Sequence, residues 1–277
     1  SGPGDAGASF ATLEEGVLAH LQHLYAYAAT DPLPPGMARV DPDFERVERG
    51  SAAFVGDLSG KWSTLENYGE TIDRILAELL LEPVPGEPFT VEKAFLDTGS
   101  PNRPGACTAA GCWLGVQGVV IHRTARPRMN ARELREYFNS TPVDQHASSH
   151  FVVDDECILQ IIPIGEAAYH ADGKNLTHIG VHVCEHNWGR PAWEATYRRL
   201  VWLTAVLVQR FKLTVADVSG HFWWDPVNRP YDPTHLGWKP TDGQATGLFD
   251  WNQFIADVAQ AAAGPGNPPP PAPERIR

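Results

Sequence analysis

The spacing of hydrophobic residues divides the chain into an N-terminal part and a longer part that follows it. In Leu13 to Ala29 and in Leu65 to Leu81, apolar residues recur every three or four positions, which predicts two amphipathic helices. We expect their apolar stripes to pack against other residues rather than to carry chemistry. The run from Pro83 to Pro88 is rich in proline and predicts a linker after the second helix.

Short apolar runs alternate with helical spacing beyond the linker. Gln117 to His122 and Ile179 to Cys184 are typical of buried strands, and Ser149 to Pro163 indicates a hairpin. Asn130 to Phe138 and Trp193 to Phe211 have the spacing of helices. This alternation predicts an α/β fold, with a central mixed β-sheet flanked by α-helices and an N-terminal helical extension.

These patterns predict three regions: a helical extension with its linker in residues 1–88, one main domain in residues 89–258, and a Pro-rich tail in residues 259–277. The tail contains Gly264 to Pro271, which predicts an extended spacer without a core of its own. The chain has 277 residues, of which 43% are hydrophobic and nine are Trp. This apolar content is enough for one good-sized core plus appendages.

The chain is acidic, with a formal net charge of -12 and an isoelectric point near 5.3. We therefore expect neither nucleic acid nor anionic lipid as a partner, because both are held by excess Lys and Arg. No run approaches the ~18 apolar residues of a membrane-spanning helix, so no span is expected. Ser1 to Gly4 resembles the remnant of a removed tag, so the lack of a signal pattern decides nothing about export.

Four cysteines are too few for a disulfide scaffold, and their spacing fits no four-cysteine zinc module. Cys107 and Cys112 lie close together in a Gly-rich segment and could form a disulfide, or they could be free buried thiols. Cys157 and Cys184 fall in apolar runs that are typical of strands.

Three residues are candidate metal ligands: His122 at the end of a buried strand, His221 after the long helix, and Asp232. A catalytic zinc takes three protein ligands of the His and carboxylate type and keeps its fourth position open. The chain has 11 His, however, so many such triples occur by chance. Residue type and spacing alone do not select this set.

A series of short blocks runs through residues 89–258. The blocks are Phe95-Leu96 with Asn102 to Gly105, Val119 to Ala125, Tyr137 to Asn139, Ser148 to Asp155, Gln160 to Pro163, Ala168 to Ala171 with Asn175, Ile179 to Glu185, and the segment around His221. In this order, they make the chain resemble the type 2 N-acetylmuramoyl-L-alanine amidases. That family shares its fold with peptidoglycan recognition proteins and a phage amidase.

The resemblance implies a zinc amidase domain in residues 89–258, with Zn2+ held by His122, His221 and Asp232. The implied activity is hydrolysis of the amide bond between N-acetylmuramic acid and L-alanine in peptidoglycan. It also implies a protein that acts at the cell wall, as a secreted enzyme or a phage endolysin. A wall-binding domain could follow the Pro-rich tail.

The resemblance further implies that Tyr169, His170 and Asn175 line a groove for the muramyl peptide. The alternative for Tyr169 and His170 is a loop that only packs against the domain.

One departure from the family concerns the pattern Ile-Gly-Ile-Glu-x-Cys-Glu, because this chain has His182 where the family usually has Glu. Alternate side chains of a strand face opposite ways, so His182 is expected to point with Gly180 and Cys184. Glu185 would then face the other side and is a poor substitute for the missing carboxylate.

A second departure precedes the third ligand, where the family often carries Lys two positions ahead. Here that position is Pro230, and the adjacent Arg229 could supply the positive charge for a developing oxyanion. Lys239 is a second candidate.

The histidine at position 182 leaves three interpretations open. His182 could act as the general base of an active hydrolase. It could instead reach the metal and close the site, which would make the domain a peptidoglycan-binding module with weak or no catalysis. It could also be an engineered change. An interaction protein without metal would require the three ligand positions to be coincidence.

Overall fold

The protein is described from a computed structural model, which covers residues 8–52, 55–63, 68–69, 71–72, 75, 86–105, 107–109, 111–124, 126, 128–140, 147–185, 190–229, 232–233 and 249–264. The chain divides into two compact units, Ser1–Asp73 and Arg74–Arg277. The second unit holds all six strands of the main sheet. The predicted domain boundary at residue 88 lies inside the second unit and stays a prediction.

The N-terminal unit contains the first predicted helix, α1 (Leu13–Ala28), which ends one residue earlier than expected. Thr12 caps it, because its hydroxyl accepts a hydrogen bond from the Glu15 N–H at 3.1 Å. The buried Gln22 accepts the backbone N–H groups of Val40 and Asp41, which holds the following segment against the helix. A short 3-10 helix, η1 (Val55–Leu58), follows.

The second predicted helix, Leu65 to Leu81, falls largely outside the described residues. The positions that are described within it, namely 68, 69, 71, 72 and 75, are helical.

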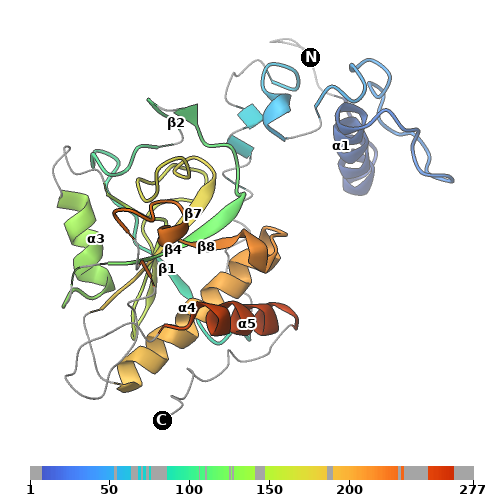
Figure 1. Cartoon of the computed structure of the whole chain (residues 1–277). Helices are drawn as coiled ribbons and strands as arrows, with labels where there is room; N and C mark the ends of the chain where they lie inside the picture. Colours follow the sequence, from blue (N-terminus) through green and yellow to red (C-terminus); the bar gives the residue numbers. More distant parts are fainter. Residues whose placement is uncertain are drawn as a thin grey trace. The chain divides into compact units, whose positions relative to one another are not determined.

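The second unit is built on a six-stranded mixed sheet in the order β1-β6-β5-β7-β4-β8 (Figure 1). Its strands are β1 (Val91–Lys93), β4 (Gly118–Arg123), β5 (Phe151–Val153), β6 (Ile158–Gln160), β7 (His178–Val183) and β8 (Val218–Gly220). Only β5 and β6 pair antiparallel, as the predicted hairpin, and the other neighbouring pairs are parallel. The expected mixed sheet is confirmed.

A small hairpin, β2 (Cys107–Thr108) and β3 (Gly111–Cys112), lies outside the main sheet, with Cys107 and Cys112 as register partners. Cys107 is disulfide-bonded. Cys157 and Cys184 are free thiols.

Helices cover both faces of the sheet (Figure 1). One face packs against α4 (Arg190–Arg210) and α5 (Trp251–Ala262) through residues such as Ile121 and Val181. The other face packs against α3 (Ala131–Ser140) through residues such as Val152. Two 3-10 turns, η3 (Val215–Asp217) and η4 (His221–Trp223), flank β8. None of the described helices combines the length and apolar character needed to cross a membrane.

The structure adds elements that the sequence patterns did not reveal. Strands β1 and β8 have three residues each, too few to display an alternating pattern. Helix α5 begins at the N-cap Asp250 and buries Phe254 and Val258. It continues to Ala262, so the predicted start of the Pro-rich tail at residue 259 was wrong. The helix extends because Ala261 and Ala262 still pack against the core.

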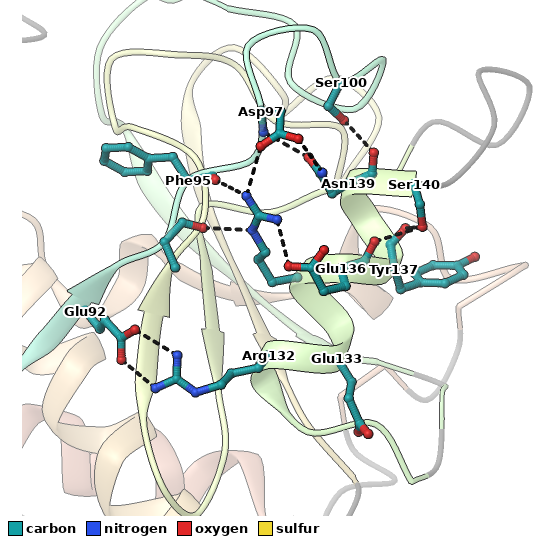
Figure 2. Close-up of polar contacts among 12 residues, drawn as sticks. Glu92, Phe95, Asp97, Ser100, Arg132, Glu133, Glu136, Tyr137, Asn139 and Ser140 are labelled. Carbon is teal, nitrogen blue, oxygen red and sulfur yellow. Dashed lines mark hydrogen bonds and ion pairs between the residues drawn. The ribbon is translucent and has the colours of Figure 1, made fainter.

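Polar contacts fix α3 to the chain around β1 (Figure 2). The Arg132 guanidinium forms two hydrogen bonds with the Glu92 carboxylate, at 2.8 and 2.7 Å. At the other end of the helix, the Asn139 amide bonds both the backbone N–H and the carboxylate of Asp97, at 2.9 and 2.8 Å. These contacts set the position of α3, whose inner face forms a wall of the cavity described below.

We expect a chain that lacks residues 1–88 to fold and to keep its metal-binding capacity. Phe89 remains and packs edge-on against Trp202, and the sheet begins only at Val91. The truncation removes the partly exposed ion pair between Glu87 and Arg210, which is worth ~1 kcal/mol or less. Urea unfolding of the truncated chain checks whether it folds. If the truncated chain shows no cooperative transition, the predicted boundary at residue 88 is wrong.

Candidate metal centre

The carboxyl ends of three neighbouring parallel strands bring the candidate ligands together. His122 lies near the end of β4, and its register partner on β7 is His182. His221 directly follows β8, whose last residue Gly220 pairs with Ile121 of β4. Because side chains alternate along a strand, Ile121 enters the core toward α4 while His122 faces the opposite side. Ligand sites commonly form at this edge of parallel sheets.

Asp232 is oriented by backbone contacts with the same strands. The Arg123 N–H donates to its Oδ1, and the Phe222 N–H donates to its carbonyl oxygen at 2.9 Å. The other carboxylate oxygen, Oδ2, therefore faces the histidines. The close approach of this segment requires Gly220, because a Cβ there would lie 2.8 Å from Cδ of Pro233.

Three potential ligand atoms form a compact triangle. The Nδ1 atoms of His122 and His221 are 3.1 Å apart, and Asp232 Oδ2 lies 3.3 Å from His221 Nδ1 and 3.9 Å from His122 Nδ1. Ligands of a tetrahedral zinc with bonds of ~2.0–2.1 Å are separated by roughly 3.3 Å. The triangle therefore fits a zinc ion, and these three residues are the group in the described part of the chain that could hold a metal.

The protonation states suit metal binding. Burial lowers the pKa of His122, which favours a neutral imidazole with a free lone pair. Burial acts to raise the pKa of Asp232, but the adjacent His122 and His221 and the Arg123 N–H outweigh it, so the pKa lies below its ordinary value. Two imidazoles and one carboxylate are a donor set of catalytic zinc sites with three protein ligands.

A cavity of about 660 Å³ opens onto these three residues. Tyr169, His170, Asn175, His182 and Arg229, all expected at the site, line it. Several other lining residues had not been predicted as site residues, among them Arg123, Thr124, Arg126, Leu134, Tyr137, Phe138, Asp172 and Asp225. Arg123 and Thr124 directly follow His122 in the sequence. This adjacency to a candidate ligand could have identified them as site residues. Pro230 and Lys239 lie outside the described residues.

His182 packs directly on the candidate ligand His122. Their rings are stacked at 4.7 Å with an interplanar angle of 8°, as neighbours on two parallel strands can be. His182 Nδ1 is buried without a hydrogen-bond partner among the described residues. Burial, followed by the neighbouring His122, holds the pKa of His182 well below its ordinary value. The ring is therefore neutral near pH 7, and the residue lines the cavity.

Glu185 is occupied elsewhere. Its carboxylate accepts a hydrogen bond from the Thr124 hydroxyl at 3.3 Å and pairs with Arg123 Nε at 3.6 Å. It is not among the residues that line the cavity. This agrees with the expectation that Glu185 does not replace the carboxylate missing at position 182.

The loop that carries Tyr169 and His170 is held by polar contacts at both ends. The Tyr169 N–H donates to the Ser148 hydroxyl, and the Ser148 N–H donates to the Tyr169 carbonyl. Asn175 Oδ1 accepts the N–H groups of His170 and Ala171, at 2.8 and 2.9 Å. The side chain of Asn175 thus shapes the loop besides facing the cavity.

His150 supports strand β7 behind the metal centre. Its burial predicts that the protein loses stability at acid pH. Its Nδ1 accepts the Gly180 N–H at 3.1 Å, and its Nε2 donates to the Glu166 carbonyl at 3.0 Å. Burial lowers its pKa to about 4 from an unfolded value of ~6.5. The unfolded chain therefore binds the proton more tightly than the folded chain does. His150 contributes ~3 kcal/mol to the free energy of unfolding above pH ~6.5, and this contribution is lost as the pH falls toward 4.

Urea titrations at several pH values, with chelator present, measure the free energy of unfolding of the parent and of His150→Gln. The difference between the two proteins gives the contribution of His150. The variant should show a shallower loss of unfolding free energy in the acid range. Equal pH slopes in both proteins would mean that His150 does not contribute in this way.

Comparison with known proteins agrees with this geometry. Residues 113–235 match the family model described as N-acetylmuramoyl-L-alanine amidase. The chain is 32% identical over 157 residues to a "Probable N-acetylmuramoyl-L-alanine amidase" of Bacillus licheniformis, which covers 52% of this chain and 40% of that protein. It is 27% identical over 190 residues to N-acetylmuramoyl-L-alanine amidase CwlH of Bacillus subtilis (strain 168), covering 66% and 67%.

Among solved structures, a mutant endolysin from Bacillus subtilis aligns with a TM-score of 0.49 at 25% identity, covering 61% of this chain and 99% of that one. The chain spans 35%, 40% and 39% of the length of three curated relatives that it matches. The matched segment contains all three members of the metal-ligand triangle. Residues 113–235 of this chain are therefore similar to the N-acetylmuramoyl-L-alanine amidases, both by the matching family model and by these relatives.

Proposed function

We propose that this protein hydrolyses the amide bond between N-acetylmuramic acid and L-alanine in peptidoglycan, with Zn2+ as cofactor. The observation that carries the proposal is the triangle of His122, His221 and Asp232, which opens onto a cavity inside the segment that matches the amidase family. When bound by these three residues, zinc would supply a Lewis acid that polarises the scissile carbonyl and makes water more acidic.

His182 is the proposed general base. Its neutral Nε2 would accept a proton from the attacking water and return it to the alanine nitrogen as the carbon–nitrogen bond breaks. The water oxygen ends on the lactyl carboxylate of the sugar, and the stem peptide leaves with a free amine. A histidine with a depressed pKa is a weak base, so we expect modest activity from the present chain.

Arg229 is the proposed partner of the negative charge that develops on the carbonyl oxygen. It lines the same cavity as His122 and His182, and its positive charge contributes to lowering the pKa of both. A fixed cation at this place would stabilise the oxyanion without reorganisation.

Tyr169, His170 and Asn175 are proposed to shape the groove that receives the muramyl peptide, because all three line the cavity. The partner is accordingly peptidoglycan, and the place of action is the cell wall, reached by secretion or by release from a phage-infected cell.

The alternative is a peptidoglycan-binding module in which His182 closes the zinc site as a fourth ligand. The described geometry favours the open site, because the group of potential ligands contains His122, His221 and Asp232 but not His182. An engineered origin of His182 would leave this geometry unchanged.

Release of soluble stem peptide from purified peptidoglycan tests the proposal. Release should require zinc, stop with chelator, and resume when zinc is restored. Binding to peptidoglycan without any release, at one zinc per chain, would support the alternative. A purified protein that takes up no zinc would exclude both.

A further inference from the structure

Two hydrogen bonds link His122 to the backbone through a second histidine, His170. His170 Nε2 lies 2.9 Å from the carbonyl oxygen of His178, and His170 Nδ1 lies 3.1 Å from His122 Nε2. A carbonyl oxygen can only accept, so His170 Nε2 must carry the hydrogen of the first bond.

The position of that hydrogen determines the second bond. The two ring nitrogens of the buried His170 face a carbonyl oxygen and another imidazole, which offer no carboxylate to hold a second proton, so the ring has one N–H. His170 Nδ1 is then an acceptor, and His122 Nε2 must donate to it. The hydrogen of the neutral His122 ring therefore lies on Nε2, and its Nδ1 holds a free lone pair. Nδ1 is the atom that faces His221 and Asp232.

The ring of His170 is held in a slot that fixes this arrangement. A Cβ on Gly180 would lie 2.7 Å from the His170 ring, so the slot exists because position 180 has no side chain. His150 accepts the Gly180 N–H and thereby holds the strand behind the slot. Asn175 Oδ1 accepts the backbone N–H of His170 at 2.8 Å.

Both ring nitrogens of His170 are used within the protein, and the residue is only 8% exposed. It can therefore shape the cavity wall but has no ring nitrogen left to bond a muramyl peptide.

We infer that His170 is a positioning residue, which sets the tautomer and ring orientation of His122 so that Nδ1 is presented to the metal. The inference rests on the zinc site of the proposed function. Groups that accept the second N–H of a metal-bound histidine typically affect metal affinity by 10–100-fold when they are replaced.

Two variants of the full chain separate this role from simple packing. In His170→Asn, the amide oxygen is bonded to Cγ, as Nδ1 is, so an acceptor for His122 is retained. In His170→Gln, the amide reaches the place of Nε2 and can still donate to the His178 carbonyl, but no acceptor remains at the Nδ1 place. Zinc affinity is measured by competition with a chromophoric chelator, and the His122 tautomer by long-range nitrogen-15 NMR of the metal-free protein.

We expect His170→Gln to bind zinc about 10–100-fold more weakly than the parent, and His170→Asn to stay close to the parent. The metal-free parent should show the His122 proton on Nε2. A proton on His122 Nδ1 in the metal-free parent would overturn the inference, and this readout does not depend on the folding of a variant. A zinc affinity of His170→Gln equal to that of the parent would also overturn it. A parent that binds no zinc at all but keeps the Nε2 tautomer would instead contradict the proposed function.

Discussion

Replacing Asp232 by alanine should lower amide hydrolysis by about 10³-fold or more and abolish stoichiometric zinc binding at micromolar metal. Asp232 supplies the one anionic atom of the triangle, 3.3 Å from His221 Nδ1 and 3.9 Å from His122 Nδ1. Its loss leaves two imidazoles, which hold a divalent cation less tightly than a set with three ligands. Metal catalysis is worth several kcal/mol, and ~4 kcal/mol corresponds to about 10³ in rate.

Asp172→Ala is the matched control for this change. Asp172 is an exposed carboxylate that lines the same cavity but lies outside the ligand group. Its loss should leave zinc stoichiometry unchanged. Zinc content and peptide release are measured on both variants, and a zinc content of one per chain in Asp232→Ala would remove Asp232 from the ligand set.

Changing His182 to Glu should raise amide hydrolysis by about 10²-fold or more, the usual contribution of a well-placed general base. The present histidine has a pKa well below its ordinary value and one nitrogen buried without a partner among the described residues. The amidase family that this chain resembles usually has Glu at this position. It offers an ionised acceptor beside the reacting water and, unlike imidazole, brings no further nitrogen ligand to the metal.

His182→Gln is the control for size and polarity, because an amide cannot take up the proton. It should be no more active than the parent. All three proteins are compared at equal zinc occupancy over a pH series. If the Glu variant is no faster than the parent at any pH, His182 does not occupy the position of the base, whatever the metal site does.

Much of the fold follows from local sequence patterns. The runs around β4, β7 and α4 are long enough for their periodicity to be read, and the structure confirms them to within a few residues. Strands β1 and β8 are too short for this, and they exist because the sheet supplies their partners. Helix α5 was missed because its apolar residues are followed by an Ala-rich run that resembles the tail.

The candidate site was predictable in its residues but not in its hydrogen bonds. His122, His221 and Asp232 were selected by resemblance, and their distances come from the register of β4 with β8 and the contacts of Asp232. The alternation of side chains correctly placed His182 away from Glu185. The contact between His170 and His122 joins residues 48 positions apart, and no local pattern encodes it.

The most direct test of the proposed zinc amidase activity is cleavage of a defined muramyl peptide in oxygen-18 water, analysed by mass spectrometry. The parent and His182→Glu should both release peptide with a free alanine amine and place one oxygen-18 atom in the lactyl carboxylate of the sugar. Chelator should stop the reaction. Label in a peptide carboxylate, a new reducing sugar end, or no cleavage by either protein at one zinc per chain would contradict the proposed function.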